Sequence, residues 1–331
     1  MLKSPMMSYP TVASGESSHF LETLRLREKL MRDTSGAIKT LARPKPAMRA
    51  AEFAFFVPLA AVGVSLTVRS HSVLALAAGI FLTALAINAF VILQHDGMHG
   101  TLLRNRRANW LVSALLAASF LMSFTAYRTM HLRHHRYLGD PRDPDEYRNY
   151  TRSIALVWLM QFVRLFFGSP IYAVLIPILA LRHATRAERR SIALEYAIVL
   201  VLWGTLLYTL PMRTLFFAWI APLLLMGVFT VVRGIAEHGF TIPCDPVVSS
   251  RTMVPNPVVS FLMLNINYHL EHHLFPEIPS YHLPRMHRLI WPRIPRAIEG
   301  RSYLGFLSAF LRAAPKMDES PIGLVHPGAE N

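Results

Sequence analysis

Four apolar stretches, arranged as two close pairs, constrain the fold of this chain most. They cover residues 51–68, 73–93, 192–210 and 214–232. Each approaches the roughly 20 apolar residues with which an α-helix crosses a bilayer. Only RSHS separates the first two stretches and only PMR separates the last two, so each pair predicts a helical hairpin. With 53% hydrophobic residues, the sequence predicts an all-α integral membrane protein with four transmembrane helices.

Histidines gather in three short boxes outside these stretches: HDGMH at 95–99, HLRHH at 131–135 and HLEHH at 269–273. Positions three and four residues apart lie on one face of a helix. Neutral imidazole binds iron, copper, zinc and nickel, and four ligands saturate a tetrahedral zinc ion. Eight clustered histidines exceed the need of one ion, so the boxes predict a site for two metals. The eight are His95, His99, His131, His134, His135, His269, His272 and His273.

A ninth histidine, His238, follows the fourth apolar stretch in RGIAEHG. At that end of the helix we expect it to point at the same site; the alternative is a histidine that caps the helix C-terminus. Asn265 and Asn267 precede the third box. We expect them either to hydrogen-bond a ligand or a metal-bound water, or to cap a helix.

Carboxylates near the boxes are candidates to accept the second ring N–H of a ligand, which metal-bound imidazoles usually donate. Three of them lie in GDPRDPDEY after the second box, where the alternative is a solvated turn. The six candidates are Asp96, Asp140, Asp143, Asp145, Glu237 and Glu271.

One shared site restricts the path of the chain between the first two boxes. If the apolar residues 110–126 crossed the membrane, these boxes would face opposite sides. We therefore expect this stretch to dip in and return or to lie along the interface. A later stretch, 153–181, is interrupted by Arg164, Gly168 and Pro170, which favours an interfacial helix followed by a short buried piece.

Charge gives the expected orientation. The formal net charge is +14, but no zinc finger or aromatic nucleic-acid motif accompanies it, so we expect no nucleic-acid partner. Four crossings leave Arg69 and Arg213 as the only Lys or Arg residues in the two outer turns, as the positive-inside bias requires. The metal site and both termini are then cytosolic, at the inner membrane if the source is bacterial.

The ends of the chain carry further expectations. Residues 1–20 have no apolar run typical of a cleavable secretory signal. Residues 1–49 are expected to form a cytosolic tail and a surface segment, because eight basic residues lie between 21 and 49. Residues 313–331 are expected to be disordered. The whole chain, 1–331, is expected to form a single domain.

The sequence lacks the residues that several other types of site require. A single cysteine, Cys244, cannot hold an iron–sulfur cluster. Glu-x-x-His, the spacing of carboxylate-bridged di-iron bundles, occurs only at Glu16–His19, outside any span. HExxH and GxSxG are absent. Any electrons that the chemistry needs must therefore come from outside the chain.

The segments HDGMHG, HLRHHRYLGDPRDPDEY, RGIAEHG and NYHLEHHLFPEIPSYHLPRMH resemble the boxes of the membrane fatty acid desaturase superfamily. This superfamily also contains lipid hydroxylases and carotenoid ketolases. The resemblance covers roughly residues 50–300, and the third box is most similar to bacterial-type acyl desaturases.

The resemblance implies a non-haem centre of two Fe ions with O2 as co-substrate. It implies the eight box histidines and His238 as metal ligands, and no catalytic residue separate from them. Some acyl desaturases carry an asparagine four residues before the histidine that matches His238, whereas this chain has Gly234. A separate ferredoxin, rubredoxin or cytochrome is the expected electron donor, because no fused cytochrome b5 is present.

The expected reaction is O2-dependent desaturation of a fatty acyl chain of a lipid, acyl-CoA or acyl carrier. The alternatives are hydroxylation or ketolation, for example of a carotenoid, at the same centre, and a non-enzymatic membrane metal-binding protein. We expect the substrate in a narrow apolar tunnel. Its candidate wall residues are Trp110, Phe120, Trp158, Phe162, Phe166 and Trp203.

Overall fold

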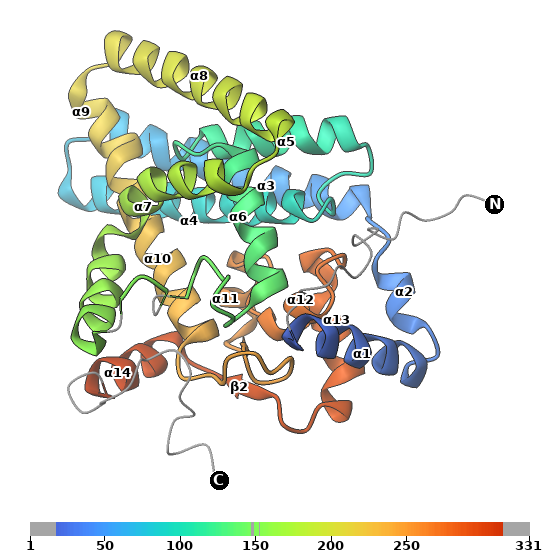
Figure 1. Ribbon diagram of the computed structural model, residues 1–331. Coiled ribbons are helices and arrows are strands. Elements are labelled where there is room, and N and C mark those ends of the chain that lie inside the picture. Colours follow the sequence, from blue (N-terminus) through green and yellow to red (C-terminus); the bar gives the residue numbers. More distant parts are fainter. Residues whose placement is uncertain (1–17, 147–148, 152, 314–331) are drawn as a thin grey trace.

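The computed structural model describes residues 18–146, 149–151 and 153–313, and these residues are mostly helical (Figure 1). Residues 1–17 and 314–331 of the predicted tails lie outside the described residues, whereas the predicted surface segment after residue 20 is described and helical in large part. The predicted single domain therefore stays a prediction for the whole chain.

Four helical segments are long and apolar enough to cross a membrane, which is the number predicted, and a bent pair, Ile154–Gly168 and Pro170–His183, would add a fifth if it is counted as one span. The first two are α3 (Pro46–Arg69) and α4 (Val73–Met98), and the third is α8 (Arg186–Thr209). The fourth, Met212–His238, consists of α9 (Met212–Leu215), the π-helical turn η2 (Phe216–Ile220) and α10 (Ala221–His238). Both α4 and α10 extend beyond their apolar stretches, so His95 and His238 lie on the last turns of spanning helices.

Glycines allow α3 and α4 to approach closely. A Cβ atom at Gly63 would lie 2.9 Å from the carbonyl oxygen of Gly79 and 2.8 Å from the backbone nitrogen of Thr83. Real Cβ atoms do not approach backbone atoms so closely, and a larger residue would push the two helices apart. The small side chains of this pair therefore fix the position of α4, which carries the first box.

The stretch 110–126 contains no helix long enough to span, as predicted. It forms α5 (Arg106–Ala118), a turn, and the start of α6 (Phe124–Tyr137). Thirteen residues make a helix of about 20 Å, shorter than the ~30 Å hydrocarbon core. Leu121 has a positive φ of 62° in the turn, and the Ser123 side chain caps α6 by accepting from the backbone N–H of Ala126.

Helix α7 (Ile154–His183) is broken where the sequence predicted an interruption. Its halves, Ile154–Gly168 and Pro170–His183, meet at 109°. Phe167 is non-helical, and Pro170 cannot donate a backbone hydrogen bond. A Cβ atom at Gly168 would lie 2.5 Å from Cγ2 of Val231 on α10. The bend therefore lets α7 pack against α10; its position relative to a membrane stays a prediction.

The C-terminal third and the N-terminal helices form a layer beside the ends of α4 and α10 (Figure 1). Leu30 and Leu41, from α1 (Ser18–Asp33) and α2 (Ala37–Leu41), belong to one buried cluster with Leu270 and Met286. The strands β1 (Arg251–Met253) and β2 (Ile298–Gly300) pair in parallel. The remaining elements are α11 (Pro257–Leu262), α12 (His269–Leu274), η3 (Ser280–His282), α13 (Leu283–Ile290), η4 (Trp291–Arg293) and α14 (Tyr303–Ala313).

A buried ionic tie joins this layer to the spanning helices. Arg49, only 2% exposed, pairs with Glu52 at 2.7 Å and with Asp96 of the first box. Asp96 also accepts hydrogen bonds from the backbone N–H and the hydroxyl of Ser280, at 3.1 and 2.8 Å. The Arg49 guanidinium lies 4.6 Å from the ring centroid of Tyr281. This tie holds η3, which follows the third box, against the start of α3 and the end of α4.

Candidate metal centre

All nine histidines predicted as ligands converge where α4, α6, α10 and α12 end or begin. Their ring nitrogens fall into two neighbouring groups. The start of α6 is fixed because the Glu195 carboxylate of α8 accepts hydrogen bonds from the Ser123 hydroxyl and from the backbone and hydroxyl of Thr125, at 2.5 to 2.9 Å. The second box follows from this anchored helix start.

The first group contains five histidines whose ligand nitrogens lie within 4.8 Å of one another. The Nε2 atom of His131 lies 2.9 Å from that of His99 and 3.0 Å from that of His135. The Nε2 atoms of His135 and His272 are 3.1 Å apart. The members are His95, His99, His131, His135 and His272.

The second group contains the other four predicted ligands. The Nε2 atom of His269 lies 2.9 Å from that of His238 and 3.0 Å from that of His273. Ring nitrogens of His134, His238 and His273 also lie within 4.8 Å of one another. His238 therefore joins the box histidines instead of only capping its helix.

The second and third boxes are each divided between the two groups. His131 and His135 belong to the first group, whereas His134 belongs to the second. In α12 the order is reversed, because His269 and His273 are in the second group and His272 is in the first. Neighbouring residues of a helix point about 100° apart. The spacing predicted one shared face, but the middle histidine of each triplet turns to the other group.

The donor set fits two metal ions. Two nitrogen atoms that bind one ion at about 2.1 Å and at right angles are about 3.0 Å apart. The five closest Nε2 separations in the two groups run from 2.9 to 3.1 Å. Imidazole suits iron, copper, zinc and nickel, so the geometry alone does not select the metal.

Burial keeps most of these imidazoles in the form that binds a metal. It lowers the pKa of His99, His131 and His135 well below the ordinary value, and neighbouring histidines lower it further. The same causes lower the pKa of the three histidines of α12, which are His269, His272 and His273. A neutral imidazole has a free nitrogen lone pair, which is the state that metal binding requires.

His134 differs because a carboxylate lies directly behind it. Burial alone would lower the pKa of His134, but the charge and the hydrogen bond of Asp143 outweigh burial and raise it to about 9. The His134 Nδ1 atom lies 3.0 and 3.2 Å from the two Asp143 oxygens. Asp143 also accepts from the backbone N–H groups of Gly139 and Asp145, both at 2.9 Å. Such a partner orients the ring and strengthens Nε2 as a ligand.

The other candidate carboxylates have different roles. Glu237 lies 3.4 Å from Nδ1 of His269, and Asp145 lies 3.7 Å from Nδ1 of His134. Asp96 is 3.8 Å from Nδ1 of His95 and mainly serves the tie with Arg49. Asp140 instead pairs with Arg142 at 2.8 Å in the turn.

Glu271, between His269 and His272 of the third box, makes its contacts outside both groups. It accepts from Thr252 at 2.5 Å and contacts Nδ1 of His287 at 2.6 Å. His238 is oriented by a partner that sequence reasoning missed, the backbone carbonyl of Ser249, 3.4 Å from its Nδ1. A backbone carbonyl carries no sequence signal.

Neither predicted asparagine has a hydrogen bond to a histidine among the described residues. The Asn267 amide donates to the carbonyl of Met253 at 2.7 Å and to the hydroxyl of Ser260 at 3.2 Å. It joins β1 to α11. Asn265 has a positive φ of 60° in the turn before the box. Both residues therefore shape the backbone that leads into α12.

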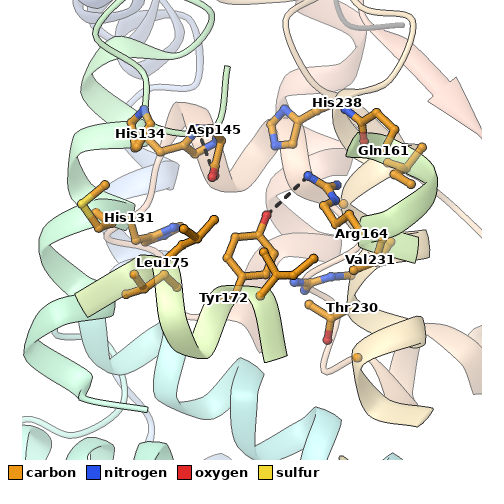
Figure 2. A pocket seen from close by; sticks show the side chains of 18 of the residues that line it. His131, His134, Asp145, Gln161, Arg164, Tyr172, Leu175, Thr230, Val231 and His238 are labelled. Atoms are coloured by element: carbon orange, nitrogen blue, oxygen red, sulfur yellow. Dashed lines mark hydrogen bonds and ion pairs between the residues drawn. The ribbon is translucent and has the colours of Figure 1, made fainter. Parts of the chain in front are cut away.

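A cavity of about 750 Å³ reaches the histidines from between α6, α7 and α10 (Figure 2). Both groups contribute to its wall, for example through His131 and His134. Most of the remaining wall is apolar and includes Met130, Leu175 and Met226. The cavity lies within the ~300–1,000 Å³ range of ligand sites.

Of the six predicted tunnel residues, only Phe120 lines this cavity. Trp158 and Phe162 pack against Phe310 on α14. The Trp203 indole donates to the carbonyl of Ala118 at 2.9 Å. The two others, Trp110 and Phe166, are exposed. Aromatic type alone therefore did not identify the wall.

The sequence did not identify the polar residues of the cavity wall. In the sequence Arg164 only interrupts an apolar segment, but in the structure it lines the cavity. Its Nη2 atom lies 3.4 Å from the position of a Cβ atom on Gly234. Gly234 stands where some acyl desaturases have an asparagine. In this chain the Arg164 guanidinium lies beside that position.

Comparison with known proteins adds independent support. The family model for fatty acid desaturase matches residues 70–304. A sphingolipid delta(4)-desaturase of Xenopus tropicalis is 24% identical over 210 residues, covering 59% of this chain and 59% of that protein. A chloroplastic omega-6 fatty acid desaturase of Arabidopsis thaliana is 24% identical over 241 residues, covering 63% of this chain and 51% of that protein. The chain thus spans little more than half the length of these relatives.

A beta-carotene ketolase of Paracoccus sp. (strain N81106 / MBIC 01143) is also similar. It is 26% identical over 223 residues, covering 65% of this chain and 80% of that protein. The superfamily expected from the boxes is confirmed, because the family match covers most of the chain and includes all nine histidines. The chain belongs to the fatty acid desaturase family.

Proposed function

We propose that this protein catalyses O2-dependent desaturation of a fatty acyl chain of a lipid, acyl-CoA or acyl carrier. The observation that carries the proposal is an apolar cavity that ends at two groups of metal-binding side chains. An unactivated C–H bond held in such a cavity requires a strong oxidant, which protein side chains alone do not provide.

In this proposal the nine histidines hold two Fe ions, five ligands for one and four for the other. Iron, when bound, supplies the O2 chemistry that breaks C–H bonds. Apolar side chains such as Met130 and Met226 hold the acyl chain and exclude water. Asp143 and Glu237 orient His134 and His269 toward the second ion.

The direct test is reconstitution of the purified full chain with iron, O2, a reductase system and a panel of acyl lipids. Mass spectrometry should detect a new double bond, and omission of iron should abolish it. A panel that includes acyl-CoA, acyl carrier protein and membrane lipids without any oxidised product would contradict the proposal.

We further propose that the centre and both termini face the cytosol, where a separate ferredoxin, rubredoxin or cytochrome supplies electrons. Arg213 donates to the carbonyls of Ser70 and Thr67, at 2.8 and 3.5 Å, so the two short turns meet at the end of α4 opposite His95. A single cysteine at position 72 or 302, in a Cys244→Ser background, tests this orientation. An impermeant thiol reagent should label Ser72→Cys in intact cells and spare Ser302→Cys; the reverse pattern would contradict the orientation.

Hydroxylation or ketolation at the same centre is the second candidate. One observation favours it: the alignment covers 80% of the beta-carotene ketolase but only 51–59% of the two desaturases. Reaction under isotopically labelled O2 separates these outcomes, because hydroxylation retains labelled oxygen in the product and desaturation does not. A non-enzymatic metal-binding protein is the third candidate, and a single bound zinc without turnover would identify it.

A further inference from the structure

The cavity beside the metal centre has one polar side, formed by α7 and α10. We call it the head-group wall and define it as Gln161, Arg164 and Arg233. Figure 2 shows Gln161 and Arg164 beside His238, with Tyr172 between Arg164 and the side of His131. An enzyme that handled only hydrocarbon in this cavity would not need such a wall.

Gln161 is the clearest sign of a missing partner. Its side chain lines the cavity and is only 2% exposed. Among the described residues it has no hydrogen-bond partner, and its Oε1 atom is fully buried. Buried amides are nearly always paired with protein, water or ligand. A polar group inside the cavity is therefore expected beside this side chain.

Arg233 has donors to spare at the same place. Its side chain is 12% exposed, and its only ion pair among the described residues is a 3.8 Å contact of Nε with Glu237. Neither Nε nor Nη1 makes a hydrogen bond within the described part of the chain. Because Glu237 also lies 3.4 Å from His269, its charge is shared between two partners. A guanidinium with free N–H groups in a low-dielectric cavity favours an oxyanion.

Arg164 adds a second positive charge close by. It donates to the Tyr172 hydroxyl at 3.4 Å. Its Nη2 atom lies 3.4 Å from the position that a Cβ atom would take on Gly234, the residue after Arg233, so the Arg164 guanidinium lies beside the turn of α10 that carries Arg233. Three further acidic residues besides Glu237 line the cavity: Asp143, Asp145 and Glu146. Asp143 and Asp145 lie 3.0 and 3.7 Å from Nδ1 of His134, so they face that imidazole.

We propose that the head-group wall binds the carboxylate or phosphate of a single-chain lipid whose hydrocarbon fills the apolar part of the cavity. The inference rests on the proposed function, because it takes this cavity as the substrate site. It narrows the substrate class: a carotene has no oxyanion, and an acyl chain carried as a thioester has no charged oxygen at its head. Arg233 precedes His238 by five residues, about 7.5 Å along a helix. The oxidised bond therefore lies in the head-proximal part of the chain.

The test measures displacement of radiolabelled hexadecanoate from the purified full chain in detergent by three unlabelled competitors. Hexadecanoate and its uncharged methyl ester differ only at the head, and hexadecyl phosphate carries the other oxyanion. We expect the acid to compete at least about tenfold more strongly than the ester, as charge-assisted hydrogen bonds predict. The stronger of the two anionic competitors identifies which oxyanion the wall prefers.

Two variants and two controls test whether the head-group wall causes the preference for the acid over the ester. Arg233→Gln should reduce the acid-to-ester ratio to about threefold or less, and Arg233→Lys should restore most of it. Gln161→Leu should weaken acid binding by about two- to tenfold; within the described part of the chain this side chain makes no hydrogen bond to Glu237 or His269, so it decides the matter if Arg233→Gln does not fold. Arg182→Gln, an exposed arginine on the same helix, should change nothing.

Equal competition by acid and ester in the wild type, or an unchanged ratio in both Arg233→Gln and Gln161→Leu, would overturn the inference. The binding assay needs no turnover. A clear preference for the anion with no oxidised product would keep the inference and reject desaturation. Desaturation of an ester or carotenoid, with no preference for the anionic competitors, would reject the inference and keep the proposed desaturation.

Discussion

The two histidine groups are fixed in different ways. In the second group, His134 has the Asp143 carboxylate behind it, His269 has Glu237, and His238 has the carbonyl of Ser249. In the first group, Nδ1 of both His95 and His99 lacks a hydrogen-bond partner among the described residues. The nearest carboxylate to these rings, Asp96, lies 3.8 Å from Nδ1 of His95, a longer contact than the 3.0 Å between His134 and Asp143. The second group therefore has a carboxylate hydrogen bond behind one of its rings, whereas the α4 side of the first group depends more on packing between helices.

The largest effect should come from removing a ligand of the first group. His272→Ala should abolish turnover and reduce bound iron from two ions to one or none, because no spare nitrogen of that group replaces it. Metal analysis and product assay on the membrane-inserted protein measure this. His183→Ala, an exposed histidine, is the control; near-wild-type turnover of His272→Ala would contradict the ligand assignment.

Removal of the carboxylate behind His134 should have the next largest effect. Asp143→Asn should weaken iron binding by about 10–100-fold, and only in the second group. Chelator titration followed by metal analysis resolves the two sites. Asp140→Asn, three residues earlier and paired with Arg142, should bind both ions normally. Equal losses from both groups would mean that the two sites are not fixed separately.

Helix packing behind the first group is tested at Gly97, between His95 of α4 and His99, the residue after α4. A Cβ atom there would lie 1.9 Å from Oγ of Ser113 on α5. Gly97→Ala should reduce the free energy of unfolding by about 1–2 kcal/mol and weaken iron binding in the first group. In the matched control Gly204→Ala, no atom lies within 4 Å of the new methyl group. A Tm for Gly97→Ala as high as that of Gly204→Ala would show that packing does not hold α4.

The smallest effect is expected at Glu237, because 3.4 Å is a looser contact than the 3.0 Å of Asp143. Glu237→Gln should weaken iron binding in the second group by less than about tenfold. The same chelator titration measures it, with the exposed Glu299→Gln as control. If Glu237→Gln exceeded Asp143→Asn in its effect, the ranking by distance would be wrong.

Hydropathy and spacing were sufficient for the parts of the fold that local sequence determines. The four spans follow from apolar length, and the bend of α7 follows from Gly168 and Pro170. The convergence of the nine histidines was also expected, because three boxes of one residue type need a common partner. The spans and the bend each depend on residues of one helix, and each histidine box is five residues long.

Features that depend on distant residues were beyond sequence reasoning. The division of each histidine triplet depends on where α6 and α12 lie relative to each other, not on spacing within one helix. The choice of Asp143 over Asp140 depends on the fold of one turn. The head-group wall combines residues of α7 and α10 that are about 70 positions apart in the sequence. In the sequence of either helix alone, its arginine is only a charged residue that interrupts an apolar segment.

The tie of Arg49, Asp96 and Ser280 also bears on biosynthesis. A ribosome makes Arg49 and Asp96 early, whereas Ser280 and the third box emerge only near the end of the chain. Until then Arg49 and Asp96 can pair with each other, but Asp96 cannot yet accept the hydrogen bonds of Ser280 in η3. The protein must therefore complete translation before its first helices find their final neighbours. In the proposed function, metal would enter after synthesis, and a chain cut short before the third box would lack His269, His272 and His273.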